Sequence, residues 1–322
     1  MKYIFFRVDS SYSIASGHLV RCQRLAKQFS KKYEVIFLIN KFHGNFNFIL
    51  KGFKKIYLNR KNDKTKIFKN DSQRTIKILK NFKGKKILIV DHYYLNNTWH
   101  KKIIKYVDKL VCINDYIKKN YCDYLINESY FPTNISQKCL KKNTKLFIGP
   151  KYALIDRKKK KTTKQNGIFV FFGSVDEKNI TLRLCKILKK ITDRKIYIII
   201  GAKNKSKKKI LSLNQKNFYM INKYVNLSLY LNKCNLAIIA GGSVVWEALY
   251  NKIRTVVIPT AINQHSNIRY LKNDNIIQTL ALNKLNESAI RKLLKQKKLK
   301  KSKTIVDGDG IKRIYKELIK VI

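Results

Sequence analysis

Two histidine-containing segments carry residue types suited to proton transfer. Gly17-His18 follows the apolar run Tyr3–Val8, and Asp91-His92-Tyr93 directly follows the apolar run Lys86–Val90. Imidazole exchanges protons near neutral pH, and a nearby carboxylate such as Asp9 can orient it. Two interpretations stay open for each segment. One is an acid–base site, and the other is a turn in which His18 or Asp91 caps a helix.

Glycine-containing segments form a second group of candidates. Ala240-Gly241-Gly242-Ser243 follows an apolar run, and its backbone N–H groups and hydroxyl can hold a diphosphate. Glu247 comes one helical turn later, where a carboxylate can accept hydrogen bonds from a ribose diol. The alternative is an ordinary glycine-rich turn and a solvated glutamate. The segment is neither GxGxxG nor a Walker sequence.

Two further segments complete the candidate set. Asn263-Gln264 follows Pro259, and its amide side chains can hold sugar hydroxyl groups. Gly173-Ser174 follows another apolar run, and we include it in the predicted nucleotide site.

Short apolar runs alternate with amphipathic stretches along the chain, which predicts strands and helices in a parallel, doubly wound α/β sheet. The predicted strands are 3–8, 35–39, 86–90, 110–113, 124–126, 167–172, 196–200, 236–240 and 255–258; the predicted helices include 17–29, 75–79, one from about 179, 243–249 and 311–322. In such sheets ligands bind beyond the carboxyl ends of the strands, where all the candidate segments lie.

A basic, nearly apolar-free stretch at 157–166 interrupts the alternation and has the composition of a linker. We therefore predict two domains: 1–156, which carries the histidine segments, and 157–322, which carries the glycine segments. A substrate held by loops of both domains predicts closure of the two on it.

Composition excludes several classes of protein. The 322 residues contain no apolar run long enough to span a membrane, no secretory signal, no CxxC pair among six cysteines and no HExxH pattern among five histidines. We expect a cytoplasmic, monomeric protein without a membrane span or a metal site.

The net charge of +52 is the unusual value, and it is compatible with a nucleic-acid partner. However, only 12 of the 71 basic residues are Arg, and the Lys residues are spread along the whole chain. A/T-rich codon usage and a selected basic surface both explain this pattern. Under either cause the field attracts anionic substrates, and we expect no specific nucleic-acid partner.

Taken together, the segments resemble the nucleotide-sugar hydrolases of pseudaminic acid biosynthesis, a family related to MurG-like glycosyltransferases of the two-domain GT-B fold. The matching segments occur in family order: RVDSSYSIASGHLVRC from Arg7, VDHYYLNNTW from Val90, CIND from Cys112, IGPKYALI from Ile148, FFGSVDEKNIT from Phe171, AGGSVVWEAL from Ala240, VIPTAINQHSN from Val257 and VDGDGIKR from Val306.

The resemblance implies a GT-B fold, a UDP-sugar and water as partners, and no cofactor. It implies that His18 is the catalytic histidine, that Asn263 contributes to the sugar pocket, and that Gly242, Ser243 and Glu247 hold the UDP. Around these we group Asp9 with His18, then Gly241, Gly173 and Ser174 with the nucleotide, and Gly17, Gln264, Asp91, His92 and Tyr93 with the sugar.

Three positions depart from the family pattern: Ser174, Ala15-Ser16 and Asn127-Glu128 stand where relatives have Gly, Gly and Asn-Gln. The expected reaction is hydrolysis of a UDP-linked 2,4-diacetamido-2,4,6-trideoxyhexose, by inverting attack of water with His18 as base. The alternatives are a GT-B glycosyltransferase with a UDP-sugar donor and a non-catalytic binder of nucleic acid or of an acidic surface.

Overall fold

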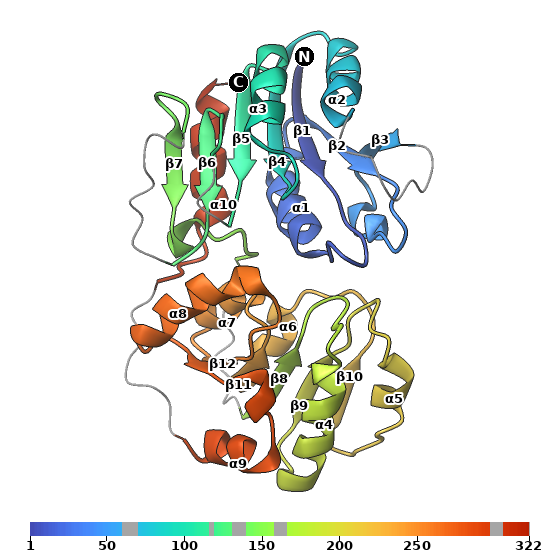
Figure 1. Cartoon of the computed structure of the whole chain (residues 1–322), viewed down its shortest axis with the longest axis vertical. Helices are drawn as coiled ribbons and strands as arrows, with labels where there is room; N and C mark the ends of the chain where they lie inside the picture. The colour runs from blue at the N-terminus through green and yellow to red at the C-terminus, as the bar shows by residue number, and fades with distance from the viewer. Residues whose placement is uncertain (60–69, 116–118, 131–139, 158–165, 297–304, 322) are drawn as a thin grey trace. The chain divides into compact units, whose positions relative to one another are not determined.

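The computed structural model describes residues 1–59, 70–115, 119–130, 140–157, 166–296 and 305–321, without the side chain of Asn263. The chain divides into two compact units, each with one parallel sheet (Figure 1). The N-terminal unit comprises Met1–Ile155 and Gly308–Ile322, and the second unit comprises Asp156–Asp307.

The sheet of the N-terminal unit has the strand order β3-β2-β1-β4-β5-β6-β7. Its strands are β1 (Lys2–Val8), β2 (Glu34–Asn40), β3 (Lys54–Asn59), β4 (Lys85–Asp91), β5 (Lys109–Ile113), β6 (Tyr124–Asn127) and β7 (Lys145–Ile148). Its helices are α1 (Gly17–Phe29), α2 (Asp71–Lys80), α3 (Asn97–Ile103) and α10 (Gly310–Leu318), with short 3-10 turns η1 (Asn47–Leu50), η2 (Ile104–Tyr106), η4 (Pro150–Tyr152) and η7 (Ile319–Val321).

The sheet of the second unit has the order β10-β9-β8-β11-β12-β13, which repeats the order of the first six strands of the other unit. Its strands are β8 (Gly167–Phe171), β9 (Ile196–Ile199), β10 (Phe218–Ile221), β11 (Cys234–Ile239), β12 (Arg254–Val257) and β13 (Gln278–Thr279). Its helices are α4 (Ile180–Ile191), α5 (Lys207–Leu211), α6 (Ser228–Leu231), α7 (Val244–Tyr250), α8 (His265–Asn273) and α9 (Glu287–Lys295), with η5 (Ile262–Gln264) and η6 (Leu282–Lys284).

The central strands are nearly continuous apolar runs because helices cover both faces of a doubly wound sheet. In β1, Ile4, Phe5, Phe6 and Val8 are fully buried. Arg7 interrupts this run and is also fully buried, so its charge needs buried partners.

The predicted domain division is wrong at the C-terminal end of the chain, because the last helix belongs to the N-terminal unit. Helix α10 packs in the N-terminal unit, where the rings of Tyr315 and Phe29 of α1 lie 5.1 Å apart. The Arg313 guanidinium donates to the carbonyl of Lys151 at 2.8 Å. A Cβ on Gly310 would lie 2.5 Å from the carbonyl oxygen of Ala153, so the two backbones are in direct contact. Gly308–Ile322 therefore does not belong to the second unit.

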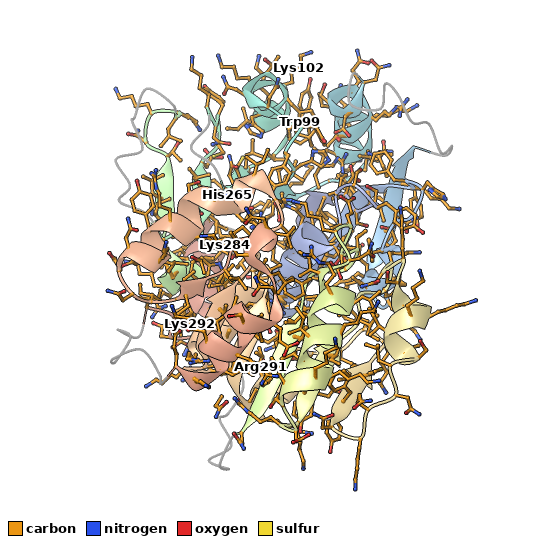
Figure 2. All side chains as sticks on the ribbon, turned by 60° about the horizontal axis from the view of Figure 1, so that its bottom comes forward. Trp99, Lys102, His265, Lys284, Arg291 and Lys292 are labelled. Carbon is orange, nitrogen blue, oxygen red and sulfur yellow. The ribbon has the colours of Figure 1, made fainter. Side chains whose placement is uncertain are left out.

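Side chains that end in nitrogen project outward from the surface of both units (Figure 2). Helix α3 shows the usual division: Trp99 is 5% exposed and donates its indole N–H to Asp71 at 2.9 Å, while Lys102 lies at the surface (Figure 2). In the part of the chain that the structure describes, no helix is both long and apolar enough to cross a membrane.

Candidate functional site

The strand order places one topological switch point in each unit. In the N-terminal unit the chain order reverses between neighbouring strands β1 and β4, and in the second unit it reverses between β8 and β11. Ligands of open α/β sheets bind at such points, beyond the carboxyl ends of the strands. The loops after β1 and β4 carry the histidine segments, and those after β8 and β11 carry the glycine segments.

His18 and Asp91 form a buried pair at the first of these points. His18 lies in the first turn of α1, and its Nδ1 is 2.5 Å from Oδ1 of Asp91, the last residue of β4. Burial favours the neutral acid, but Arg21 and His18 hold the pKa of Asp91 well below its usual range. Because the carboxylate only accepts, Nδ1 must carry the hydrogen of this bond.

The neutral imidazole of His18 therefore has its lone pair on Nε2. Among the described residues Nε2 has no hydrogen-bond partner, and the side chain is 8% exposed. Gly17, the first residue of α1, is exposed, and a Cβ there would meet nothing within 4 Å. The arrangement therefore places an oriented imidazole, His18, next to the exposed backbone of Gly17.

Arg21 and Tyr93 complete the surroundings of the pair. Arg21, one turn along α1, donates to Asp91 from Nε at 2.6 Å and from a terminal nitrogen at 2.7 Å. The ring of Tyr93 meets the ring of His18 edge-on, with centroids 4.3 Å apart. Of the predicted sugar contacts, Tyr93 thus lies directly at His18, whereas Asp91 is buried beneath it with both oxygens occupied.

Asp9, the predicted companion of His18, belongs to a different cluster. Its carboxylate accepts from Arg7 at 2.7 Å, from the backbone and side chain of Asn40 at 2.7 and 3.0 Å, and faces Nε2 of His92 at 3.1 Å. None of these bonds reaches His18, so the prediction that Asp9 orients the imidazole is wrong. Asp91 holds that position instead.

His92 has both ring nitrogens engaged within this cluster. Nδ1 accepts the backbone N–H of Tyr94 at 3.1 Å, so Nε2 carries the hydrogen and donates to Asp9. Burial lowers the pKa of His92, although Asp9 partly offsets it. With both ring nitrogens hydrogen-bonded, His92 supports the loop after β4. A contact of its ring with the sugar stays a prediction.

The two glycine loops of the second unit lie at its switch point. Gly173, after β8, has a φ of +90°, which favours glycine. Gly201, in the loop after β9, lies so close that a Cβ on it would be 2.3 Å from the carbonyl oxygen of Gly173. The carbonyl of Ser174 accepts the backbone N–H of Lys203 at 2.9 Å. The loop at Gly173-Ser174 is therefore held by direct backbone contact.

Gln264 joins the loops after β11 and β12. Its Oε1 accepts the backbone N–H of Gly241 at 3.2 Å and that of Thr260 at 2.9 Å. Gly242 is exposed, with nothing within 4 Å of a Cβ there, and Ser243 is half-buried just before α7. Gln264 thus positions the glycine loop, a role that the sequence analysis did not assign to it.

Glu247 is 3% exposed, so the alternative of a solvated glutamate is wrong. The Ser228 hydroxyl of α6 donates to Oε2 of Glu247 at 3.5 Å. Asn263 lies in η5, but its side chain is outside the described part of the structure.

The sequence analysis did not single out Arg21, and it noted Glu128 only as a departure. Glu128 follows β6, is 2% exposed, and accepts the backbone N–H of Leu154 at 3.1 Å. Burial raises its pKa to about 7, although Arg21 opposes this shift. The i, i+3 spacing of His18 and Arg21 was the available sequence signal, since it places both on one helix face.

Within the described residues, no group of three or more His, Cys, Asp or Glu side chains is arranged to hold a metal ion. Free, buried thiols are found at Cys22, Cys112, Cys122, Cys185 and Cys234, while Cys139 lies outside the described residues.

Comparison with known proteins gives two sequence matches. Residues 167–317 match the glycosyltransferase family 28 C-terminal domain. The chain is also 26% identical over 280 residues to the UDP-2,4-diacetamido-2,4,6-trideoxy-beta-L-altropyranose hydrolase of Campylobacter jejuni, a match that covers 83% of this chain and 95% of the relative.

Solved structures match over almost the whole chain. The UDP-GlcNAc 2-epimerase of Neisseria meningitidis has a TM-score of 0.66 at 12% identity, covering 99% of this chain and 100% of its own. MurG of Acinetobacter baumannii has a TM-score of 0.62 at 12% identity, covering 98% and 94%. At these identities the likeness concerns the fold alone, and it confirms the predicted class: two Rossmann-like α/β units of the GT-B type.

Proposed function

We propose that this chain hydrolyses a UDP-sugar, releasing UDP and the free sugar. The observation that carries the proposal is the buried His18–Asp91 pair, which leaves a basic Nε2 at the switch point of the N-terminal unit. The 26% identity to a hydrolase of this kind supports the activity and suggests a UDP-linked 2,4-diacetamido-2,4,6-trideoxyhexose as substrate.

In the proposed reaction Nε2 of His18 takes a proton from water as the water oxygen bonds to the anomeric carbon. The bond from that carbon to the diphosphate oxygen breaks, and its electron pair leaves with UDP. The transition state resembles an oxocarbenium ion, and a single displacement inverts the anomeric centre. Asp91 stabilises the imidazolium that forms, because it already accepts the Nδ1–H.

The proposed nucleotide site lies at the switch point of the second unit. Gly173, Ser174, Gly242 and Ser243 lie in the loops after β8 and β11, and their backbone N–H groups are proposed to stabilise the charge of the diphosphate. Gly241 belongs to the same loop, which Gln264 holds through the Gly241 N–H. Glu247 is proposed for the ribose. Gly17, Tyr93 and Asn263 are proposed for the sugar, and His92 and Gln264 support the loops that carry such contacts.

The test is incubation of the protein with a panel of UDP-sugars followed by NMR. We expect equimolar UDP and free sugar from a 2,4-diacetamido substrate, with the inverted anomer at the first turnover. In water enriched in the heavy oxygen isotope, the label should enter the sugar and not the UDP. Label in the UDP would mean attack at phosphorus, and no release from any substrate would contradict the proposal.

A glycosyltransferase is the second candidate, because residues 167–317 match a glycosyltransferase domain. It would use the same donor but an acceptor alcohol in place of water. Sugar transfer to an added acceptor at a rate above hydrolysis would favour this candidate.

A further inference from the structure

Arg21 bridges two carboxylates that come from different strands of the sheet. Its Nε and one terminal nitrogen bind both oxygens of Asp91, at the end of β4. Its other terminal nitrogen binds Oδ1 of Asp115, two residues beyond β5, at 2.6 Å. Arg21 is 6% and Asp91 is 1% exposed, so the bonds between them form away from bulk water, whereas the side chain of Asp115 is partly exposed. The three bonds together fix the guanidinium plane.

Each of these carboxylates also binds one side chain at the candidate site. Asp91 accepts from Nδ1 of His18 at 2.5 Å, and Asp115 accepts from the hydroxyl of Tyr93 at 3.1 Å. The rings of His18 and Tyr93 are in edge-to-face contact at 4.3 Å. Five side chains therefore form a closed ring of contacts, in which each one touches the next: His18, Asp91, Arg21, Asp115, Tyr93 and back to His18.

The contact of 3.3 Å between Arg21 and Nδ1 of His18 fits this arrangement without being a bond of its own. The guanidinium and Nδ1–H are both donors, and both point at Oδ1 of Asp91. They lie close together because they share one acceptor. Loss of the guanidinium would free Asp91 to turn, and the imidazole would lose its fixed direction.

We propose that Arg21 is a positioning residue for this site: through Asp91 it fixes the tautomer and direction of His18, and through Asp115 it holds Tyr93 against the imidazole. The catalytic meaning of this role depends on the proposed hydrolysis, whereas the positioning itself does not. In this scheme Arg21 acts through the two carboxylates, because Nε and both terminal nitrogens each donate a hydrogen bond to one of them, and it is given no contact with a reacting atom.

The main test compares Arg21→Gln and Arg21→Lys with the native protein. A shift of about 1 Å in a catalytic group can cost about 10²-fold in rate. We expect Arg21→Gln to lower kcat by roughly 10- to 100-fold, while the Kd for UDP changes by less than about 3-fold. Arg21→Lys should fall between the two, because a single ammonium group cannot hold both carboxylates in the geometry of the fork.

A structural readout separates this proposal from the proposed function. Nitrogen NMR of labelled histidine should show the Nδ1–H tautomer for His18 in the native protein and a mixture of tautomers in Arg21→Gln. Guanidinium added to Arg21→Ala should restore part of the Nδ1–H population and, if the protein is a hydrolase, part of kcat. Arg24→Gln is the matched control, since Arg24 lies one turn further along α1, is also buried, and binds the carbonyl of Leu154 at 3.3 Å.

An unchanged His18 tautomer in folded Arg21→Gln would overturn the positioning role, whatever the activity. If Arg21→Gln fails to fold, Asp115→Asn tests the other arm of the ring of contacts, with loss of the Tyr93–His18 contact as the expected result. Altered tautomers without any hydrolase activity in the native protein would support the positioning and reject the proposed function.

Discussion

His18 is the single residue on which the proposed chemistry depends. His18→Asn keeps a side chain of similar size but removes the basic Nε2. General base catalysis typically contributes about 10²–10⁴-fold, so we expect hydrolysis to fall by at least ~10²-fold. Affinity for UDP should stay within about 3-fold, because the proposed nucleotide loops lie in the other unit. Steady-state rates and calorimetric titration with UDP measure the two quantities.

His43→Asn is the control for this substitution. His43 is an exposed histidine of the same unit, and its ring packs on Tyr12 with centroids 5.5 Å apart. The variant His43→Asn should keep the turnover of the native protein. Full turnover in His18→Asn would move water activation to another group, and the His18–Asp91 pair would then be structural.

Glu128 gives a pH-dependent prediction about stability. Burial raises its pKa from the ordinary value of about 4.5 to about 7, so the folded state binds a proton more tightly than the unfolded state. Stability from this group is therefore complete below about pH 4.5 and is lost as pH rises to about 7. At 1.36 kcal/mol per pH unit, the loss is at most on the order of 3 kcal/mol.

Glu128→Gln keeps an oxygen for the N–H of Leu154 and has no proton to lose. We expect it to be more stable than the native protein at pH 8 by on the order of 1–3 kcal/mol, and the difference to shrink towards pH 5. Urea unfolding at both pH values measures this. Glu287→Gln is the control, because the side chain of Glu287 is 44% exposed, on the solvent side of α9. An equal difference for Glu128→Gln at both pH values would show that Glu128 is not protonated on folding.

Residue types and spacing predict which residues lie at the site, but not which side chains they hydrogen-bond to. His18, Asp91 and Tyr93 were each chosen because they follow an apolar strand, and the parallel sheet brings them together. The prediction that Asp9 accompanies His18 is wrong, because Asp9 and Asp91 follow neighbouring strands and only their side-chain directions distinguish them. The carboxylate of Asp9 accepts hydrogen bonds from Arg7 and Asn40, whereas that of Asp91 faces His18.

At the scale of elements, the sequence predicted central strands and missed those at the edges. Strands β1, β4, β8 and β11 are buried on both faces and appear as continuous apolar runs. The terminal strands β3, β7, β10 and β13 were not predicted. In β7 and β10 several residues are exposed, because an edge strand is covered less completely, so apolar and polar residues mix over only four positions.

The contact between the loops after β8 and β9 gives a prediction at this scale. A Cβ on Gly201 would lie 2.3 Å from the carbonyl oxygen of Gly173 and 2.5 Å from that of Ser174. Since these are backbone atoms, Gly201→Ala must displace the loop. We expect a loss of roughly 1–3 kcal/mol in stability and weaker binding of UDP.

Thermal unfolding and calorimetric titration of UDP test Gly201→Ala. Leu211→Ala is the control, because Leu211 is 37% exposed and lies in α5, the helix that follows the same loop. Native affinity for UDP in folded Gly201→Ala would remove the Gly173-Ser174 loop from the proposed nucleotide site.

At the scale of the whole molecule, the two units share a strand order and divide the proposed work. The order 3-2-1-4-5-6 occurs in both sheets, so each unit has one switch point with its own loops. Acid–base residues gather at one and glycine-rich backbone at the other. The return of α10 to the N-terminal unit was not predicted, because an amphipathic helix fits either unit and only tertiary packing distinguishes them.

The net charge of +52 leads to the final prediction. Basic side chains project from both units, so the field is broad and acts on any anion that approaches (Figure 2). Such a field raises the encounter rate with a doubly charged UDP-sugar and leaves the chemical step unchanged. Screening shortens its reach from about 30 Å at 0.01 M salt to about 10 Å at 0.1 M.

We therefore expect kcat/KM to fall by roughly 3- to 10-fold between about 0.01 and 0.3 M NaCl, while kcat changes by less than about 2-fold. Initial rates at low and saturating UDP-sugar measure both. Duplex DNA provides the contrasting ligand: its binding should be weak at 0.15 M salt and should not depend on sequence. A kcat/KM that is insensitive to salt would show that the field does not steer the substrate. Tight, sequence-dependent binding of DNA would instead indicate that the basic surface serves a nucleic-acid partner.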